Sequence, residues 1–455
     1  MTFLDADGSR VAPSRGDDDG AVADIAVIGA GPAGIAATVR AAEAGRRVVL
    51  LDESPNAGGQ IWRHRVRDGL DPEARRWLDR LSRARARIRH GIAVVDIVRD
   101  ADAAGFAIVT ERLSGGAEVV RARSLVMATG ARERFLPFPG WTLSGVLGVG
   151  GAQALLKQGA TFSGKRVVIA GTGPLMLPVA ASMVSGGARV VLVAEQARAA
   201  AVRDFALSLL AHPETLLKAA MYRLAFARTP YALDTWVTEA TGPGRVTAVL
   251  VSDGRSTRAV SCDVLCTGYG LVPNVELARI VGCATNGGAV IVNDRQETSV
   301  AGVFAAGEIT GIGGVALSLV EGEAAGAVAA GAMRIDSALV RRRASLRDMA
   351  VRLERTFVLR PALASLSRDD TIICRCEDVR RGALASLGDS RQAKLYTRAG
   401  MGACQGRVCG PALEVLFGWS PGTVRSPIEP TRLSTLCVAA TIVPRAEVPA
   451  ASSSE

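Results

Sequence analysis

Histidine, lysine and aromatic side chains are scarce in this chain of 455 residues. It has three histidines and 4% aromatic residues, and arginine carries almost all of the positive charge behind the formal net charge of +10. No serine–histidine–aspartate set or nucleophile elbow is present in the sequence, which argues against nucleophilic hydrolysis. No basic stretch is interleaved with aromatic residues, which argues against nucleic-acid binding.

Long apolar runs and a secretory leader are also missing. The most apolar stretch, residues 311–331, contains Glu321 and Glu323. It therefore falls short of the roughly eighteen uncharged apolar residues of a membrane-spanning helix. Residues 1–21 are polar and rich in aspartate and glycine, which predicts a disordered leader rather than a signal peptide. We expect a cytoplasmic protein with no transmembrane segment.

A glycine-rich motif between residues 29 and 34 follows an apolar run and opens a helical pattern. A second apolar run then ends in two acids, which completes a strand–helix–strand unit of about thirty residues. This context predicts a dinucleotide site, with the pyrophosphate at the helix N-terminus and an acid on the ribose diol. The candidate residues are Gly29, Gly31, Pro32, Ala33, Gly34, Asp52 and Glu53.

Three later segments are candidates to complete this nucleotide site. Each lies at a turn after an apolar run, where small residues let the backbone approach a flat ring or a phosphate. The candidate residues are Gly59, Gln60, Ala128, Thr129, Gly130, Gly307 and Glu308. The acid at position 308 could bond a ribityl hydroxyl, or it could cap the helix that follows.

A second strand–turn–helix–strand unit spans residues 165–195. In its turn Met176 takes the place of the third glycine, and Glu195 ends its second strand. We expect the fold of this unit to be kept, whereas NAD(P) binding is doubtful because the altered turn changes helix–strand packing.

Four cysteines near the C-terminus form the most specific motif. Cys374 and Cys376 make a C-x-C pair, and Cys404 and Cys409 make a C-x4-C pair. Clustered thiols without a secretory signal are typical of metal ligands. The spacing favours a [2Fe-2S] cluster, with each pair on one iron. A structural zinc site is the alternative, although zinc usually takes C-x2-C pairs.

These motifs together resemble a known group of flavoproteins. The first glycine motif, with the GGQ, ATG and AAGE turns, is similar to the two-dinucleotide-domain flavoprotein disulfide reductases, without their redox cysteines. CRCEDV and GACQGRVCGP resemble a bacterioferritin-associated-ferredoxin-like [2Fe-2S] domain. With DESPNAGGQIWR and EITGIGGVALSLVEGEAAG, the combination resembles the α-type subunit of hetero-oligomeric amine dehydrogenases such as opine oxidase, hydrogen cyanide synthase, D-hydroxyproline dehydrogenase and dye-linked proline dehydrogenase.

The resemblance implies an α/β architecture with two Rossmann-like dinucleotide-binding domains and a small, mainly helical C-terminal [2Fe-2S] domain. It covers about residues 22–426. The expected parts are a leader (1–21), an FAD-binding domain (22–150 and 285–335), an inserted NAD(P)-binding-like domain (151–284), a connecting helix (336–370), the [2Fe-2S] domain (371–426) and a tail (427–455).

The resemblance also implies FAD bound by the first motif and its later turns. Many members have aspartate where this chain has Glu308. Substrate oxidation would occur on a separate β-type flavoprotein subunit. Some relatives hold an FMN at the subunit boundary, and a small third subunit is a further expected partner. Electrons would pass to a quinone or another acceptor.

Two other interpretations of the sequence stay open. The chain could be a self-sufficient NAD(P)H-dependent flavin and iron–sulfur reductase, or a scaffold with vestigial cofactor folds. The scarcity of acid–base residues suits a chain that passes electrons through cofactors, because the cofactors carry that chemistry.

Overall fold

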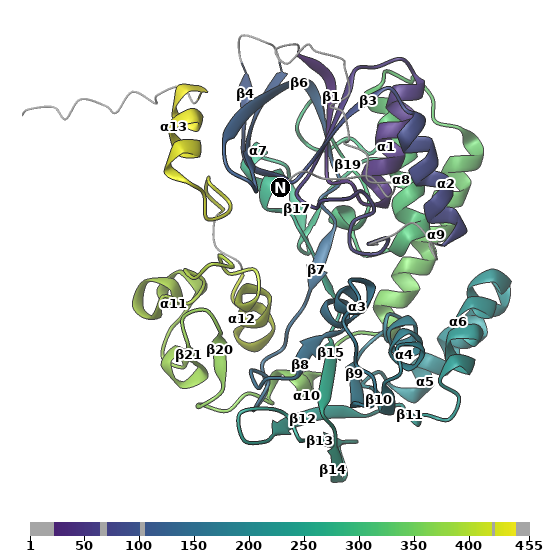
Figure 1. Cartoon of the computed structure of the whole chain (residues 1–455), viewed down its shortest axis with the longest axis vertical. Helices are drawn as coiled ribbons and strands as arrows, with labels where there is room; N and C mark the ends of the chain where they lie inside the picture. The colour runs from purple at the N-terminus through teal and green to yellow at the C-terminus, as the bar shows by residue number, and fades with distance from the viewer. Residues whose placement is uncertain (1–21, 64–70, 101–104, 421–423, 443–455) are drawn as a thin grey trace, which may run out of the picture.

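Two sheet-centred α/β domains and a smaller C-terminal unit make up the computed structural model, which describes residues 22–63, 71–100, 105–420 and 424–442 (Figure 1). The leader expected at residues 1–21 lies outside these ranges. None of the helices in the described ranges has both the length and the apolar character needed to cross a bilayer.

The first domain is built on a seven-stranded sheet with the order β3-β2-β1-β6-β5-β4, in which β19 also pairs with β6. Strands β3, β2, β1, β6 and β19 run parallel, and β4 and β5 continue the sheet as an antiparallel meander. Its strands are β1 (Ala23–Ile28), β2 (Val48–Asp52), β3 (Ala86–His90), β4 (Ile92–Asp100), β5 (Gly105–Arg112), β6 (Ala117–Met127) and β19 (Val303–Ala305).

Helices α1 (Pro32–Glu43) and α8 (Gly314–Ala329) pack closely against each other beside this sheet. A Cβ at Gly322 would lie 2.2 Å from the carbonyl oxygen of Ala33, so only glycine permits this approach. The close contact brings the N-terminus of α1 next to the turn before α8. Helix α2 (Pro72–Arg83) buries Trp77 in the same core.

The second domain repeats the plan with a five-stranded parallel sheet, β11-β10-β9-β15-β8. Because β8 belongs to this sheet, the domain begins slightly before the expected residue 151. Its strands are β8 (Val146–Gly148), β9 (Arg166–Gly171), β10 (Arg189–Glu195), β11 (Tyr231–Ala232) and β15 (Val264–Gly268). Its helices are α3 (Val149–Lys157), α4 (Met176–Ser185), α5 (Ala199–Ser208), η1 (Leu209–Ala211) and α6 (Pro213–Ala225).

Smaller elements join and extend the two domains. Strands β7 (Ala131–Glu133) and β16 (Leu271–Pro273) pair antiparallel where the chain enters and leaves the second domain. The others are the antiparallel sheet of β12 (Trp236–Thr241), β13 (Ala248–Ser252) and β14 (Thr257–Ser261), then α7 (Glu276–Val281), β17 (Thr285–Asn286), β18 (Ala289–Val290) and η2 (Glu308–Thr310).

Helix α9 (Ser337–Thr356) and the short α10 (Pro361–Ala364) lead to the C-terminal unit. In Figure 1 α9 runs from the upper domain toward the lower one. The unit contains β20 (Ile372–Cys374), β21 (Val379–Arg380), η3 (Arg381–Leu384), α11 (Ser390–Thr397) and α12 (Cys409–Phe417).

The expectation of a simple tail from residue 427 is corrected by the structure. Ile428 is buried in the core of the first domain, and helix α13 (Leu433–Ile442) follows it. Arg432 and Thr435 both bond the carboxylate of Glu111 on β5, at 3.0 and 2.6 Å. The chain therefore returns to the first domain after the cysteine-bearing unit.

Candidate functional site

The first glycine turn has the shape that a pyrophosphate requires. A Cβ at Gly34 would lie 1.8 Å from the carbonyl oxygen of Gly29, so helix and strand touch there. A Cβ at Gly31 would meet no atom of the described chain within 4 Å, so this side of the turn is open. No described side chain caps α1, and Pro32 lies at its first turn. The free first-turn N–H groups and the helix dipole suit a phosphate.

The two acids at the end of β2 have different environments. Asp52 is 9% exposed and accepts hydrogen bonds from the backbone N–H groups of Ala30 and Ser54, so it holds the turn together. Glu53 faces solvent and is the acid that remains available for a ribose diol. Partial burial, together with the charges of Glu429 and Asp52, raises the pKa of Glu53.

The other predicted turns converge on this region. The N–H of Gly58 donates to the carbonyl of Ala30 at 2.8 Å, and Gly59 lies against Gly31. Gln60 is exposed and accepts from Arg63 at 2.8 Å.

The Ala128–Gly130 turn lies on the other side of the motif. A Cβ at Gly29 would lie 2.3 Å from the carbonyl oxygen of Ala128. The hydroxyl of Thr129 donates to the carbonyl of Asn274 at 2.6 Å, and the N–H of Asn274 donates to the carbonyl of Gly130 at 2.9 Å. Thr129 and Gly130 are thus fixed by the strand that returns from the second domain.

Two acids with separate roles lie at the turn between β19 and α8, Glu308 in the turn itself and Glu321 within α8. Glu308 accepts from the N–H of Gly314 at the start of α8, and burial nevertheless raises its pKa. Glu321, which the sequence marked only as a break in an apolar run, is 2% exposed. It accepts from the N–H of Gly307 at 3.0 Å and from Arg347 of α9 at 3.0 Å. Glu321 therefore ties the turn to α9.

The second glycine turn is occupied by the protein's own groups. Glu195 is fully buried, and it accepts from the backbone N–H groups of Gly173 and Ala197, both at 2.8 Å. Burial raises the pKa of Glu195 to about 7. The carboxylate that would face the ribose of a dinucleotide is thus used within the fold.

The connector between α9 and α10 (residues 357–360) covers this second turn. Thr172 donates to the carbonyl of Phe357 at 3.3 Å. The side chain of Gln196 accepts from the N–H of Arg360 at 3.0 Å, and Arg360 also pairs with Asp234. The connector therefore lies where a nucleotide would approach the turn.

The four predicted metal ligands come together in the C-terminal unit. They line one cavity of about 120 Å³, whose other walls include Phe135 and Trp141 of the β7–β8 segment. Cys374, at the end of β20, and Cys409, at the start of α12, are each 1% exposed. Cys376 is exposed and Cys404 is half-buried.

The thiol contacts run between the two cysteine motifs. Cys374 is hydrogen-bonded to Cys409, and Cys376 to Cys404, so each contact joins the two motifs rather than lying within one. The reason is local, since Cys374 ends a buried strand whereas Cys376 has already turned to the surface. The hydrogen bond from Cys409, with backbone N–H groups led by that of Gly400, lowers the pKa of Cys374 to about 5.

The arrangement is one of two thiol pairs rather than four thiols around a point. Among the described residues, no three His, Cys, Asp or Glu side chains are grouped so as to hold a single metal ion. Gly402 lies against Cys376, where a Cβ would approach the cysteine Cβ to 2.2 Å.

Several residues that join the cysteine-bearing unit to the rest of the chain were missed from the sequence. The indole N–H of Trp141 donates to the carbonyl of Ile372 at 2.6 Å. Arg132 donates to the carbonyl of Arg407, between two of the cysteines, at 3.2 Å and to Asn274 at 2.7 Å. The clustered aromatic residues of the FLPFPGW segment were the available signal in a chain with so few.

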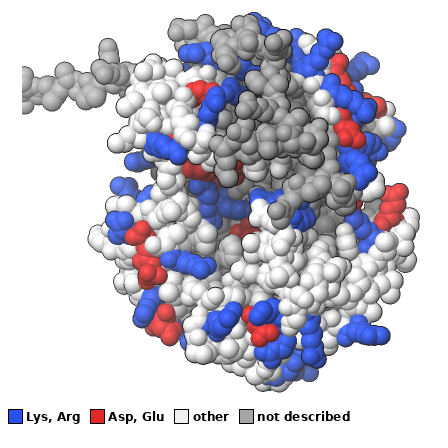
Figure 2. Space-filling view, in the orientation of Figure 1, with Lys and Arg blue, Asp and Glu red and all other residues white. Residues whose placement is uncertain are grey.

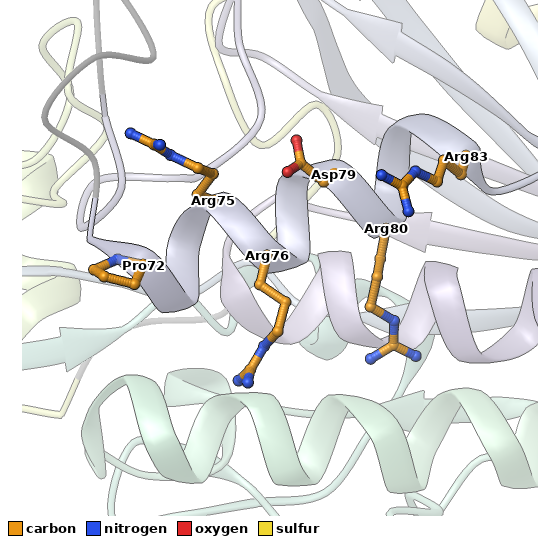
Figure 3. Close-up of a pocket in the computed structure, with 6 residues that line it drawn as sticks. All are labelled: Pro72, Arg75, Arg76, Asp79, Arg80 and Arg83. Carbon is orange, nitrogen blue, oxygen red and sulfur yellow. The ribbon is translucent and has the colours of Figure 1, made fainter.

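A larger hollow of about 480 Å³ lies away from both sites. Figure 3 shows that its lining residues all project from α2 and none comes from a glycine turn. Arg80 pairs with Glu43 at 2.9 Å and stacks on Trp77, and Arg76 pairs with Glu73. These contacts are those of a solvated helix face.

Comparison with known proteins identifies the nucleotide folds. The family model for pyridine nucleotide-disulphide oxidoreductases matches residues 23–333, which include both glycine turns. The chain belongs to this family. As a member of the pyridine nucleotide-disulphide oxidoreductases it is a flavin oxidoreductase, and FAD is its flavin.

Relatives of this pyridine nucleotide-disulphide oxidoreductase include components of larger enzymes. The A subunit of opine oxidase from Rhizobium meliloti (strain 1021) is 33% identical, over 90% of this chain and 97% of the relative. Hydrogen cyanide synthase subunit HcnB of Pseudomonas protegens is 31% identical, over 84% of this chain and 89% of the relative. The chain is thus an oxidoreductase subunit related to components of multi-subunit enzymes.

Solved structures agree on the fold. A thioredoxin reductase of T. acidophilum has a TM-score of 0.53 and 25% identity, over 68% of this chain and 97% of that chain. An L-proline dehydrogenase from P. horikoshii has a TM-score of 0.67 and 19% identity, over 91% of this chain and 79% of that chain. At this identity the second comparison shows the fold alone.

Proposed function

We propose that this chain is the flavin and iron–sulfur electron-transfer subunit of a hetero-oligomeric dehydrogenase. A partner flavoprotein subunit oxidises a carbon–nitrogen bond of an amino acid, imino acid or opine, and this chain passes the electrons to a quinone or another acceptor. The observation that carries the proposal is the convergence of four thiols in one cavity beside Phe135 and Trp141. The names of the relatives, opine oxidase and hydrogen cyanide synthase, support the substrate class.

The residues fit both cofactors that this role needs. The open side of Gly31, the uncapped α1 and Glu53 would hold the pyrophosphate and ribose of FAD. Cys374, Cys376, Cys404 and Cys409 would hold the irons of a [2Fe-2S] cluster, because thiolates are the usual ligands of such clusters. Together these groups convert two-electron chemistry into one-electron transfer.

The geometry argues against the alternative of an NAD(P)H-dependent reductase. A nicotinamide dinucleotide would have to displace the connector over the second turn and free Glu195 from two backbone N–H groups. A cytoplasmic location, an FMN at a subunit boundary and a small third subunit stay predictions from the resemblance.

The cofactor content of anaerobically purified chain is the first test. We expect about two iron atoms and two acid-labile sulfides per chain, together with one FAD. Zinc without sulfide would contradict the relay, and protein without flavin absorbance would favour the scaffold interpretation.

The source of electrons is the second test. Stopped-flow mixing with NADH should bleach the flavin slowly. Amine oxidation with an artificial dye should require a co-expressed β-type subunit. Fast bleaching by NADH, or turnover of an amine by this chain alone, would refute the assignment.

A further inference from the structure

A row of apolar side chains is exposed on the outer edge of the second domain. Within the described chain, α5 and α6 bury none of their residues. Five large apolar side chains on α5, η1 and α6 are between 62 and 72% exposed. They are Leu207, Leu210, Leu217, Met221 and Leu224. Figure 2 shows a broad surface with few charged side chains where Figure 1 places these helices.

The centre of this surface is one stripe along α6. Leu217, Met221 and Leu224 are spaced four and three residues apart, which places them on one face of the helix. Monomeric proteins rarely expose such contiguous apolar patches, and larger ones mark interaction sites.

The charges at the two ends of α6 are opposite. Glu214 lies in its first turn, and Arg228 lies just beyond its last residue. Both are exposed, and neither side chain forms a hydrogen bond or ion pair with another described residue. Met221 lies midway between them in the sequence. An antiparallel copy of the helix, related by a two-fold axis near Met221, would place each glutamate opposite an arginine.

A membrane surface fits these observations less well. Lipid-binding helices present free basic groups beside the apolar face and often an aromatic anchor. Here Arg223 is bonded to the carbonyls of Phe226 and Thr229, Lys218 lies 3.9 Å from Asp71, and Arg228 alone among the basic residues 213–228 has a side chain without a described partner. The five exposed residues include no aromatic side chain.

We infer that α6 is a dimerisation surface whose partner is a second copy of this chain. The apolar stripe forms the centre of an isologous contact, and two Glu214–Arg228 pairs close its ends. The antiparallel helix dipoles favour the same arrangement. Helix α6 and the cysteine-bearing unit lie at opposite sides of Figure 1, so the dimer leaves that unit free for other subunits.

Sedimentation equilibrium of the purified chain tests this inference, which is independent of the proposed electron-transfer role. Wild type should form a dimer of twice its 47.2 kDa, with a dissociation constant below about 100 µM. Met221→Glu should be monomeric. Glu214→Arg and Arg228→Glu should each weaken the dimer roughly tenfold, because each reversal turns two surface pairs into repulsions. The double exchange, Glu214→Arg with Arg228→Glu, should restore it.

These variants are at exposed positions, so thermal melts and flavin content should match wild type. A monomeric wild type, a dimer that survives Met221→Glu, or a double exchange no tighter than the single changes would overturn the inference. Flotation of the wild type with vesicles of phosphatidylcholine and phosphatidylglycerol would overturn it in favour of a membrane surface.

Discussion

Alanine at two neighbouring glycines should separate folding from flavin binding. At Gly34 the added Cβ would lie 1.8 Å from the backbone oxygen of Gly29, so α1 must move away from the end of β1. Overpacking of this kind costs about 1–3 kcal/mol. At Gly31 the Cβ meets nothing, and φ is −73°, which alanine adopts without strain. Alanine at position 31 also lowers the conformational entropy of the unfolded chain, which stabilises the fold by about 0.4–1 kcal/mol. This gain offsets the cost of replacing glycine by alanine at the N-cap of α1.

The apo form of Gly31→Ala should therefore unfold within about 0.5 kcal/mol of wild type. Its methyl group would nevertheless fill the space where the pyrophosphate approaches the backbone. We expect FAD affinity to fall by about a hundredfold, which is about 2.7 kcal/mol. The stabilisation that saturating FAD gives to wild type should shrink by the same amount.

Thermal melts of apoprotein with and without added FAD measure both quantities at once. Gly34→Ala should lower the apo melting temperature, whereas Gly31→Ala should lose only the shift produced by FAD. Gly151→Ala is the matched control, because its Cβ would make one ordinary contact at 3.8 Å in a helix of the other domain. If Gly31→Ala binds FAD like wild type, or melts like Gly34→Ala, the assignment of the open side to the cofactor is refuted.

Three further predictions concern other parts of the structure. Replacing Arg347 by Met leaves the buried carboxylate of Glu321 without its cation, so urea unfolding should show a loss of about 1–3 kcal/mol. Adding Glu321→Gln to the Arg347→Met variant should recover part of the lost free energy of unfolding. Between pH 4.5 and 7 the folded protein keeps a proton on Glu195 that the unfolded chain has lost. The free energy of unfolding should thus fall with rising pH by up to about 3 kcal/mol, and Glu195→Gln should flatten this slope. Cys376→Ser should lower iron content, whereas Cys437→Ser, at an equally exposed thiol, should not.

The parts of the fold that depend on local sequence were predictable. The first glycine motif, its helix and its second strand lie within thirty residues, so spacing and apolar pattern sufficed. The turns at Gly59, Gly130 and Gly307 do approach that motif, and they also contact residues distant in the sequence. Thr129 bonds Asn274, a partner 145 positions away, which no local pattern indicates.

The contacts that cross between domains were not predictable. Glu321 was visible only as a charge in an apolar run, because its partner Arg347 lies on another helix. The spacing of the cysteines indicated metal ligands, but it could not show that each thiol contact would join the two motifs. That pairing depends on which end of each motif the core buries.

Helix α9 and the connector after it contact the turns of both nucleotide folds. At one end, Arg347 of α9 binds Glu321 beneath the turn of the first nucleotide fold. At the other, the connector lies on the second glycine turn and is held there by Thr172 and Gln196. The chain then leads directly to the cysteine-bearing unit, where Trp141 bonds the strand before Cys374. The connector that covers the second turn is thus continuous in sequence with the segment that carries the thiols. A nucleotide bound at that turn would have to break the bonds of Thr172 and Gln196 to the connector, whereas Trp141 would still hold the strand that ends at Cys374.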